Sequence, residues 1–212
     1  MTTTKKTLLL AIVVLLGVAA LAADFPRAEV QVDYAYTRFV PNATYAPHLN
    51  LNGGGGAFIF NINHLIGIEA ELVGSASSKA TWTIPKGNTI VPNGATVSVS
   101  GNLFTYLFGP RINIPVKKIN PYFDFLFGGA HTSAYGNAFN AVNKASAAPS
   151  GNAFGMAIGG GLDLPVSKTI SVKLGQFDYL MTRFNNGFTS TKNENNFRYQ
   201  AGIVFRFAKH SL

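Results

Sequence analysis

The stretch Asn196–Phe207 reads NFRYQAGIVFRF, and the alternation of its side chains decides the fold. Apolar residues occupy every second position, namely Phe197, Tyr199, Ala201, Ile203, Phe205 and Phe207. The positions between them include Arg198, Gln200, Gly202 and Arg206. Successive side chains of a strand point to opposite faces of its sheet. The segment therefore predicts a strand with one apolar face and one face that carries charge.

The same two-residue period recurs in seven further segments, 27–39, 54–63, 65–74, 104–113, 123–127, 154–164 and 170–174. One face of these segments is apolar, and the charged side chains fall on the other face. The charged face carries Glu29, Asp33, Glu69, Glu71, Asp124, Asp163, Arg111, Lys173, Arg198 and Arg206. Asp178 joins this face only if a bulge near Gly175 and Gln176 shifts the register by one residue.

The apolar face determines the class of fold. A soluble barrel or sandwich encloses its apolar face and shows charge to water. Here the face rich in Phe is too extensive to be buried by eight strands alone, so it is predicted to meet lipid. Backbone groups left unpaired in hydrocarbon cost several kcal/mol each, so the eighth strand must pair with the first. The sequence predicts an all-β protein, an eight-stranded antiparallel transmembrane β-barrel.

The lengths of the connections give an independent indication of the same fold. Long polar connections, 39–52, 75–96, 133–152 and 183–196, alternate with short turns at 63–65, 115–119 and 165–168. Short periplasmic turns and long extracellular loops are typical of transmembrane β-barrels. Pro110 falls near the end of a predicted strand, and the pattern alone offers no reason for it.

The first residues differ from the rest of the chain. Lys5 and Lys6 precede an apolar run, and Ala20 and Ala22 stand where a signal peptidase would cleave. The run is too short for a membrane-spanning helix, which needs about 20 residues. We therefore expect residues 1–22 to be a cleaved signal peptide and residues 23–212 to form the barrel domain.

Three segments resemble the small outer-membrane β-barrel proteins of the OmpA-like and opacity types. They are FGPRINIPVKKINPYFDFLFGGAH at 108–131, GGGLDLPVSKTISVKLGQFDYLMTRF at 159–184, and FRYQAGIVFRF at 197–207. The assembly signal of this family matches Gln200, Gly202, Phe205 and Phe207, although AKHSL follows it here. The resemblance implies an outer-membrane location in a Gram-negative envelope. It also implies insertion by the barrel-assembly machinery.

The predicted lumen is narrow. Eight strands enclose a space just wide enough to be filled by side chains, so an open pore is not expected. Since each buried charge needs a partner, the ten charged residues named above are predicted to form a salt-bridge network that plugs the barrel. The acids outnumber the bases, which leaves a narrow cation-preferring channel as the alternative. The main interpretation is a structural or surface-interaction role.

An enzymatic alternative depends on His131 and Ser133. The sequence His131-Thr132-Ser133 resembles the His-x-Ser of lipid A deacylase barrels, in which a base activates a hydroxyl. The loop that follows lacks a Glu that could orient the His, so the protein is not expected to be an enzyme. The four His residues also lack the spacing of a zinc site, and no metal or other cofactor is predicted.

The formal charge of +8 raises the question of an anionic partner. Lys79, Lys86 and Lys144 lie in the long loops and are scattered, whereas a nucleic-acid site would be a basic stripe with interleaved aromatic residues. We therefore expect these cations to contact outer-membrane lipids and lipopolysaccharide and not nucleic acid. The protein is expected to be monomeric.

Overall fold

The computed structural model describes residues 25–41, 47–87, 93–114, 116, 118–133, 151–184 and 193–210, with 208–210 as backbone only. The predicted signal peptide 1–22 and the loop residue Lys144 lie outside the described residues. Among the residues that are described, no helix has the length and apolar character needed to cross a membrane.

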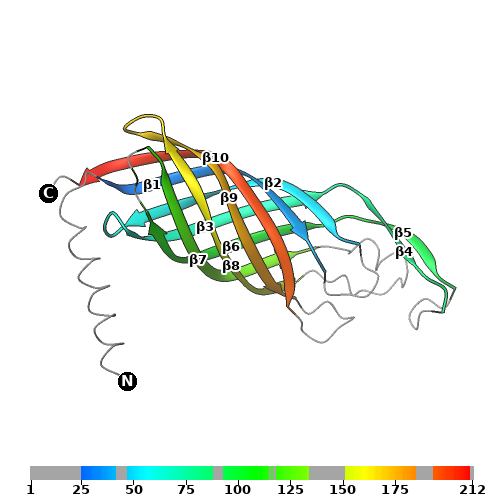
Figure 1. Cartoon of the computed structure of the whole chain (residues 1–212). Helices are drawn as coiled ribbons and strands as arrows, with labels where there is room; N and C mark the ends of the chain where they lie inside the picture. Colours follow the sequence, from blue (N-terminus) through cyan, green and yellow to red (C-terminus); the bar gives the residue numbers. More distant parts are fainter. Residues whose placement is uncertain are drawn as a thin grey trace, which may run out of the picture.

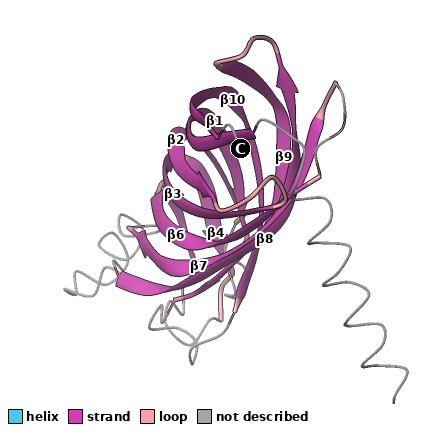
Figure 2. Ribbon diagram, turned by 90° about the vertical axis from the view of Figure 1, so that its left-hand side faces the viewer, coloured by secondary structure: helices cyan, strands magenta, loops and turns pink. Residues whose placement is uncertain are grey.

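Eight strands form one closed antiparallel barrel, as predicted (Figure 1; Figure 2). The strands are β1 (Phe25–Phe39), β2 (Leu49–Asn61), β3 (Ile66–Ser77), β6 (Asn102–Asn113), β7 (Asn120–Thr132), β8 (Gly151–Pro165), β9 (Ile170–Arg183) and β10 (Glu194–His210). Their order around the barrel is β1-β10-β9-β8-β7-β6-β3-β2. Neighbours in the sheet are consecutive along the chain, apart from the hairpin inserted between β3 and β6.

The barrel closes where β1 pairs with β10. The register runs from Phe25↔His210 to Arg38↔Phe197 without a shift. The predicted strand ended at Phe207, but β10 continues to His210 because the first residues of β1 offer it backbone partners. Most of the AKHSL segment is thus part of the closing strand.

The connections at the two ends of the barrel differ as predicted. Short turns at 62–65, 114–119 and 166–169 define the periplasmic end, and the opposite end is extracellular. The connection 75–96, predicted as a loop, instead contains β4 (Ala80–Ile84), which pairs with β5 (Ala95–Val99). Both strands have only five residues, so their alternation is too short to be recognised in the sequence.

A β-bulge interrupts β9, in agreement with the shift near Gly175 and Gln176 conjectured from the sequence. Lys173 and Gln176 lie opposite Gly202 and Gln200 of β10, so β9 has one extra residue at this point. The ladder to β8 shifts by one residue at the same place. Both Lys173 and Gln176 are buried, and Asp178 follows Gln176 on the inward face.

Most strands are longer than the sequence pattern predicts. The segment predicted at 123–127 is the middle of Asn120–Thr132, and the one at 170–174 is the start of Ile170–Arg183. Small residues such as Gly128 and Gly129 hide the period in the first case, and the bulge hides it in the second. Pro110 lies at a gap in the β6–β7 ladder, which passes from Phe108↔Phe127 to Arg111↔Asp124, so its missing N–H donor is tolerated there.

An apolar belt surrounds the barrel. In β1 the outward residues Val32 and Tyr34 are half exposed, whereas Asp33, which lies between them, is 5% exposed. The same contrast holds in the other strands, where the outward row includes Phe58, Leu72, Phe108, Phe123, Phe177 and Ile203. A face of this kind is stable only in contact with lipid.

The fold depends on close packing at Gly202. A Cβ atom there would overlap the carbonyl oxygen of Val32 and the inward carboxyl group of Asp33. We expect Gly202→Ala to lower the free energy of unfolding by about 1–3 kcal/mol, because backbone atoms must move to admit the methyl group. Urea titration of the barrel refolded in lipid vesicles measures this change.

Gly74→Ala is the control for this prediction. A Cβ atom at Gly74 would lie 3.6 Å from Cδ2 of Phe104, an ordinary van der Waals contact, and would face the lipid. An equal loss of stability in the two variants would show that close packing at Gly202 is not the cause.

Candidate functional site

The interior of the barrel has two tiers. Charged and amide side chains fill the half nearer the short turns, and aliphatic and aromatic side chains fill much of the half nearer the long connections. Three ion-pair clusters, each built around one base, occupy the polar tier.

The first cluster surrounds Arg111 of β6. Its Nη2 lies 2.7 Å from Oδ2 of Asp163, and its Nη1 lies 3.4 Å from Oε2 of Glu69. Its Nε donates a hydrogen bond to Oδ1 of Asn113 at 3.0 Å. The guanidinium carbon lies 3.5 Å from the centroid of the Tyr122 ring. Two carboxylates, an amide and an aromatic face therefore hold this cation across the barrel.

The second cluster surrounds Lys173 of β9. Its Nζ donates hydrogen bonds to Oδ2 of Asp33 at 2.9 Å, to Oε1 of Gln31 at 2.6 Å and to Oε1 of Gln176 at 2.9 Å. Tyr122 also donates a hydrogen bond to Oε1 of Gln176, at 2.9 Å. Gln176 thus joins this cluster to the first one.

The third cluster surrounds Arg198 of β10. Its Nη1 lies 2.8 Å from Oε1 of Glu71, and its Nε lies 2.8 Å from Oδ2 of Asp178. Gln200 donates hydrogen bonds to the same two carboxylates, at 2.7 and 3.2 Å. Gln176 reaches Oδ1 of Asp178 at 3.0 Å, which connects all three clusters into one network.

The remaining predicted network residues are less tightly paired. Asp124 accepts a hydrogen bond of 3.2 Å from Gln176 and forms no ion pair with a described base. Glu29 accepts a hydrogen bond of 3.3 Å from Asn61. Arg206 faces Glu29 across the β1–β10 ladder, but its guanidinium contacts the hydroxyl of Ser171 at 3.5 Å.

Sequence reasoning missed the neutral members of the network. Gln31, Tyr122 and Gln176 bridge charged groups, yet they carry no charge to mark them. The inward position of Gln31 could have been read from the period of β1. That of Gln176 follows only from the conjectured bulge, which reverses the period just before it.

The apolar tier was also missed. Phe39, Leu51, Leu107, Leu126 and Leu180 point inward and belong to one buried cluster. Trp82, Ile84 and Val99 of the β4–β5 hairpin are part of the same cluster, so the hairpin packs against the extracellular end of this tier. The prediction of a lumen filled by charge describes mainly the periplasmic half, although Glu194 is buried at the extracellular start of β10 and accepts a hydrogen bond of 3.0 Å from Thr182. An inward Leu carries no charge or polar group that marks its face in the sequence.

The predicted assembly-signal residues divide between the two faces of β10. Gln200 is buried in the charge network, and Gly202 lies opposite Asp33. Phe205 and Phe207 are exposed on the lipid-facing side. Recognition by the assembly machinery remains a prediction.

His131 and Ser133 do not form a base and nucleophile pair in the structure. The exposed ring of His131 contacts Oδ1 of Asn152 at 3.1 Å, and the Ser133 hydroxyl donates to Oδ1 of Asn102 at 2.8 Å. Within the described ranges there is also no group of three or more His, Asp or Glu side chains that could hold a metal ion.

Charge is sorted by sign between the inside and the outside. Of the described acids, Glu29 is half-buried and the others are buried. The exposed charged side chains in the described part of the chain are all basic, namely Arg27, Arg38, Lys79, Lys86, Lys118, Lys168 and Arg183. The predicted loop cations Lys79 and Lys86 are among them. The outer surface therefore presents positive charge at both ends of the barrel.

The closed sheet, the apolar belt and the charged interior define a β-barrel of the outer-membrane type. Solved structures support this class. Neisserial surface protein A is similar over 85% of this chain and 97% of its own, with a TM-score of 0.60 and 12% identity. Ail of Yersinia pestis, in complex with the heparin analogue sucrose octasulfate, has a TM-score of 0.52 and 14% identity over 86% of this chain and 99% of its own.

The outer membrane protein OprG from Pseudomonas aeruginosa has a TM-score of 0.51 and 9% identity, over 88% of this chain and 98% of its own. No protein-family model and no curated protein sequence matches the chain. At these identities the similarity establishes the fold. The fold and the apolar belt agree with the predicted location in the outer membrane.

The charge network makes a specific prediction about stability. Replacing Arg198 with Met leaves Glu71 and Asp178 buried without their cation, so the free energy of unfolding should fall by about 3–5 kcal/mol. Arg206→Met is the matched control. Arg206 is half-buried and forms no ion pair at contact distance with a described carboxylate, so its loss should cost less than about 1 kcal/mol. Urea unfolding in vesicles compares the two, and equal losses would contradict the prediction.

Proposed function

We propose that the protein is an integral outer-membrane barrel with a sealed lumen, which acts in envelope structure and in surface contact through its extracellular side. The observation that carries this proposal is the double filling of the interior. A charge network occupies the periplasmic half and an apolar cluster occupies the extracellular half. Ions would have to lose their hydration to pass the apolar cluster, which is costly.

The proposal extends to assembly and partners. The barrel is proposed to be monomeric and to be inserted through recognition of β10 by the barrel-assembly machinery. Its lipid partners are the bilayer around the apolar belt and lipopolysaccharide at the extracellular rim. No nucleic-acid partner is proposed.

The narrow cation path is the second candidate function. The surplus of carboxylates in the interior favours it, because Asp124 forms no ion pair with a described base and several buried carboxylate oxygens in the described part of the chain accept no hydrogen bond. The apolar tier opposes it. A lipid-modifying enzyme is disfavoured by the separate partners of His131 and Ser133.

The sealed lumen is tested by conductance in planar bilayers. We expect the purified barrel to show no steady current, because side chains occupy both tiers. The same preparation should migrate differently on gels before and after boiling, which verifies that the barrel is folded. A steady cation current from the folded barrel would support the narrow channel and refute the seal.

Contact with lipopolysaccharide is tested by charge reversal. Lys79 and Lys86 are exposed next to the β4–β5 hairpin. We expect replacement of Lys79, Lys86 and Lys144 by Glu to abolish salt-sensitive binding to lipopolysaccharide, since favourable charge contacts become repulsive. Replacement of Lys118 and Lys168, in the turns at the other end, by Glu is the control. If the control abolished binding equally, the site would not be in these loops.

A further inference from the structure

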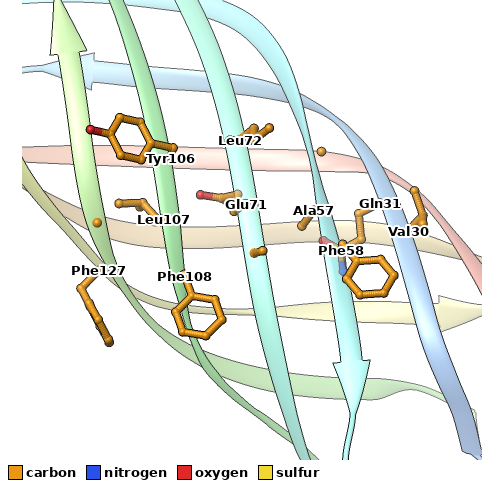
Figure 3. Close-up of a pocket in the computed structure, with 13 residues that line it drawn as sticks. Val30, Gln31, Ala57, Phe58, Glu71, Leu72, Tyr106, Leu107, Phe108 and Phe127 are labelled. Atoms are coloured by element: carbon orange, nitrogen blue, oxygen red, sulfur yellow. The ribbon is translucent and has the colours of Figure 1, made fainter.

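A groove of about 650 Å³ crosses the lipid-facing wall of the barrel from β1 to β7 (Figure 3). Small residues, Gly56 and Ala70, form its floor. Its rim includes Val30, Phe58, Leu72, Tyr106, Phe108 and Phe127. Ala70 pairs with Phe58 of β2 on one side and with Phe108 of β6 on the other. A single methyl group thus lies between two large side chains, which makes a recess in the belt.

The position of the groove identifies the leaflet that it meets. Ala70 follows Ile66, the first residue of β3 at the periplasmic end, by four positions. Four residues of a strand span roughly 13 Å. One leaflet of the hydrocarbon core is about 15 Å thick, so Ala70 and the floor of the groove around it lie within the periplasmic leaflet. Acyl chains of that leaflet are the molecules that reach it.

A cationic side chain, Arg27, lies at the periplasmic end of this wall. The guanidinium carbon of Arg27 lies 5.4 Å from the centroid of the Phe60 ring. Phe60 is the next outward residue of β2 after Phe58, which rims the groove. Arg27 is exposed and makes no ion pair with an acid in the described ranges. Stacking on an aromatic face leaves the donors of a guanidinium available for a phosphate group.

We propose that this wall binds one phospholipid of the periplasmic leaflet, with an acyl chain in the groove over Ala70 and its phosphate group at Arg27. The proposal rests on the proposed function, that of an integral outer-membrane barrel. Arg27 lies nearer the periplasmic end of the wall than the groove does. A lipid headgroup likewise lies nearer the membrane surface than its acyl chain. The bound acyl chain fills a recess in the belt. The straight acyl chains of the surrounding bilayer would pack poorly against this recess.

The test is native mass spectrometry of the full barrel refolded in detergent and titrated with phosphatidylglycerol. Parallel titrations use a diacylglycerol, which lacks the phosphate, and inorganic phosphate alone. Ala70→Phe fills the groove from the lipid side and leaves the interior untouched. Its control is Ala76→Phe, an exposed residue higher on the same strand and outside the groove. Arg27→Gln is compared with Arg38→Gln, an exposed cation at the other end of β1.

We expect the wild type to retain phosphatidylglycerol and Ala70→Phe to lose it, while Ala76→Phe keeps it. Arg27→Gln should weaken binding of phosphatidylglycerol about fivefold, as expected for one cation at an anionic surface, and leave binding of diacylglycerol unchanged. Arg38→Gln should change neither. Equal retention of phosphatidylglycerol by Ala70→Phe and Ala76→Phe would overturn the site. The site would also be overturned if inorganic phosphate alone bound at Arg27 and this binding explained the whole difference between Arg27→Gln and the wild type.

A further outcome would assign the groove differently. If the wild type forms a dimer that Ala70→Phe dissociates, the occupant is a second copy of the chain and the lipid proposal is wrong. Each variant is checked for a gel shift on boiling. A wild type without that shift would count against the membrane barrel itself, whereas a folded barrel without lipid selectivity counts against the groove alone.

Discussion

The whole structure depends on one requirement, that no backbone polar group may face hydrocarbon without a hydrogen-bond partner. A sheet of eight strands can meet it only by joining its last strand to its first. The β1–β10 ladder does so without a register shift along nearly the full length of β1. The extension of β10 to His210 belongs to the same solution, because it pairs the first residues of β1.

Closure also decides where each side chain goes. Once the cylinder exists, one side of every strand faces lipid and the other faces a space too narrow for bulk water. Acidic groups are therefore placed inside, where Arg111, Lys173 and Arg198 offset their burial. The bases that remain outside have no exposed acids near them in the described part of the chain. The surface charge of the protein is thus a by-product of filling its interior.

Much of the fold and of the charge network can be predicted from the sequence. The features that cannot be predicted have identifiable physical reasons. The two-residue period is enough for the closed barrel, its belt and the inward acids, because lipid and lumen impose opposite demands on neighbouring positions. The bridging role of Gln176 was not predicted, because it depends on contacts across the barrel that a local sequence pattern does not contain. The apolar tier escaped because inward Leu residues look like outward ones when period alone is considered. The β4–β5 hairpin was too short to stand out.

The extra residue in β9 has a consequence for how the chain tolerates insertions and deletions. Ahead of it Lys173 faces the lumen from an odd position, and after it Gln176 and Asp178 do so from even ones. Removing Gly175 alone would close the bulge and leave an uninterrupted alternation, in which Gln176 and Asp178 still face the lumen and Phe177 and Tyr179 still face the lipid. A residue removed from a regular part of the strand would instead rotate everything beyond it by half a turn, and would place a carboxylate in the hydrocarbon. The bulge is therefore the point of β9 where the chain can lose one residue without exchanging the side chains that meet lipid and lumen.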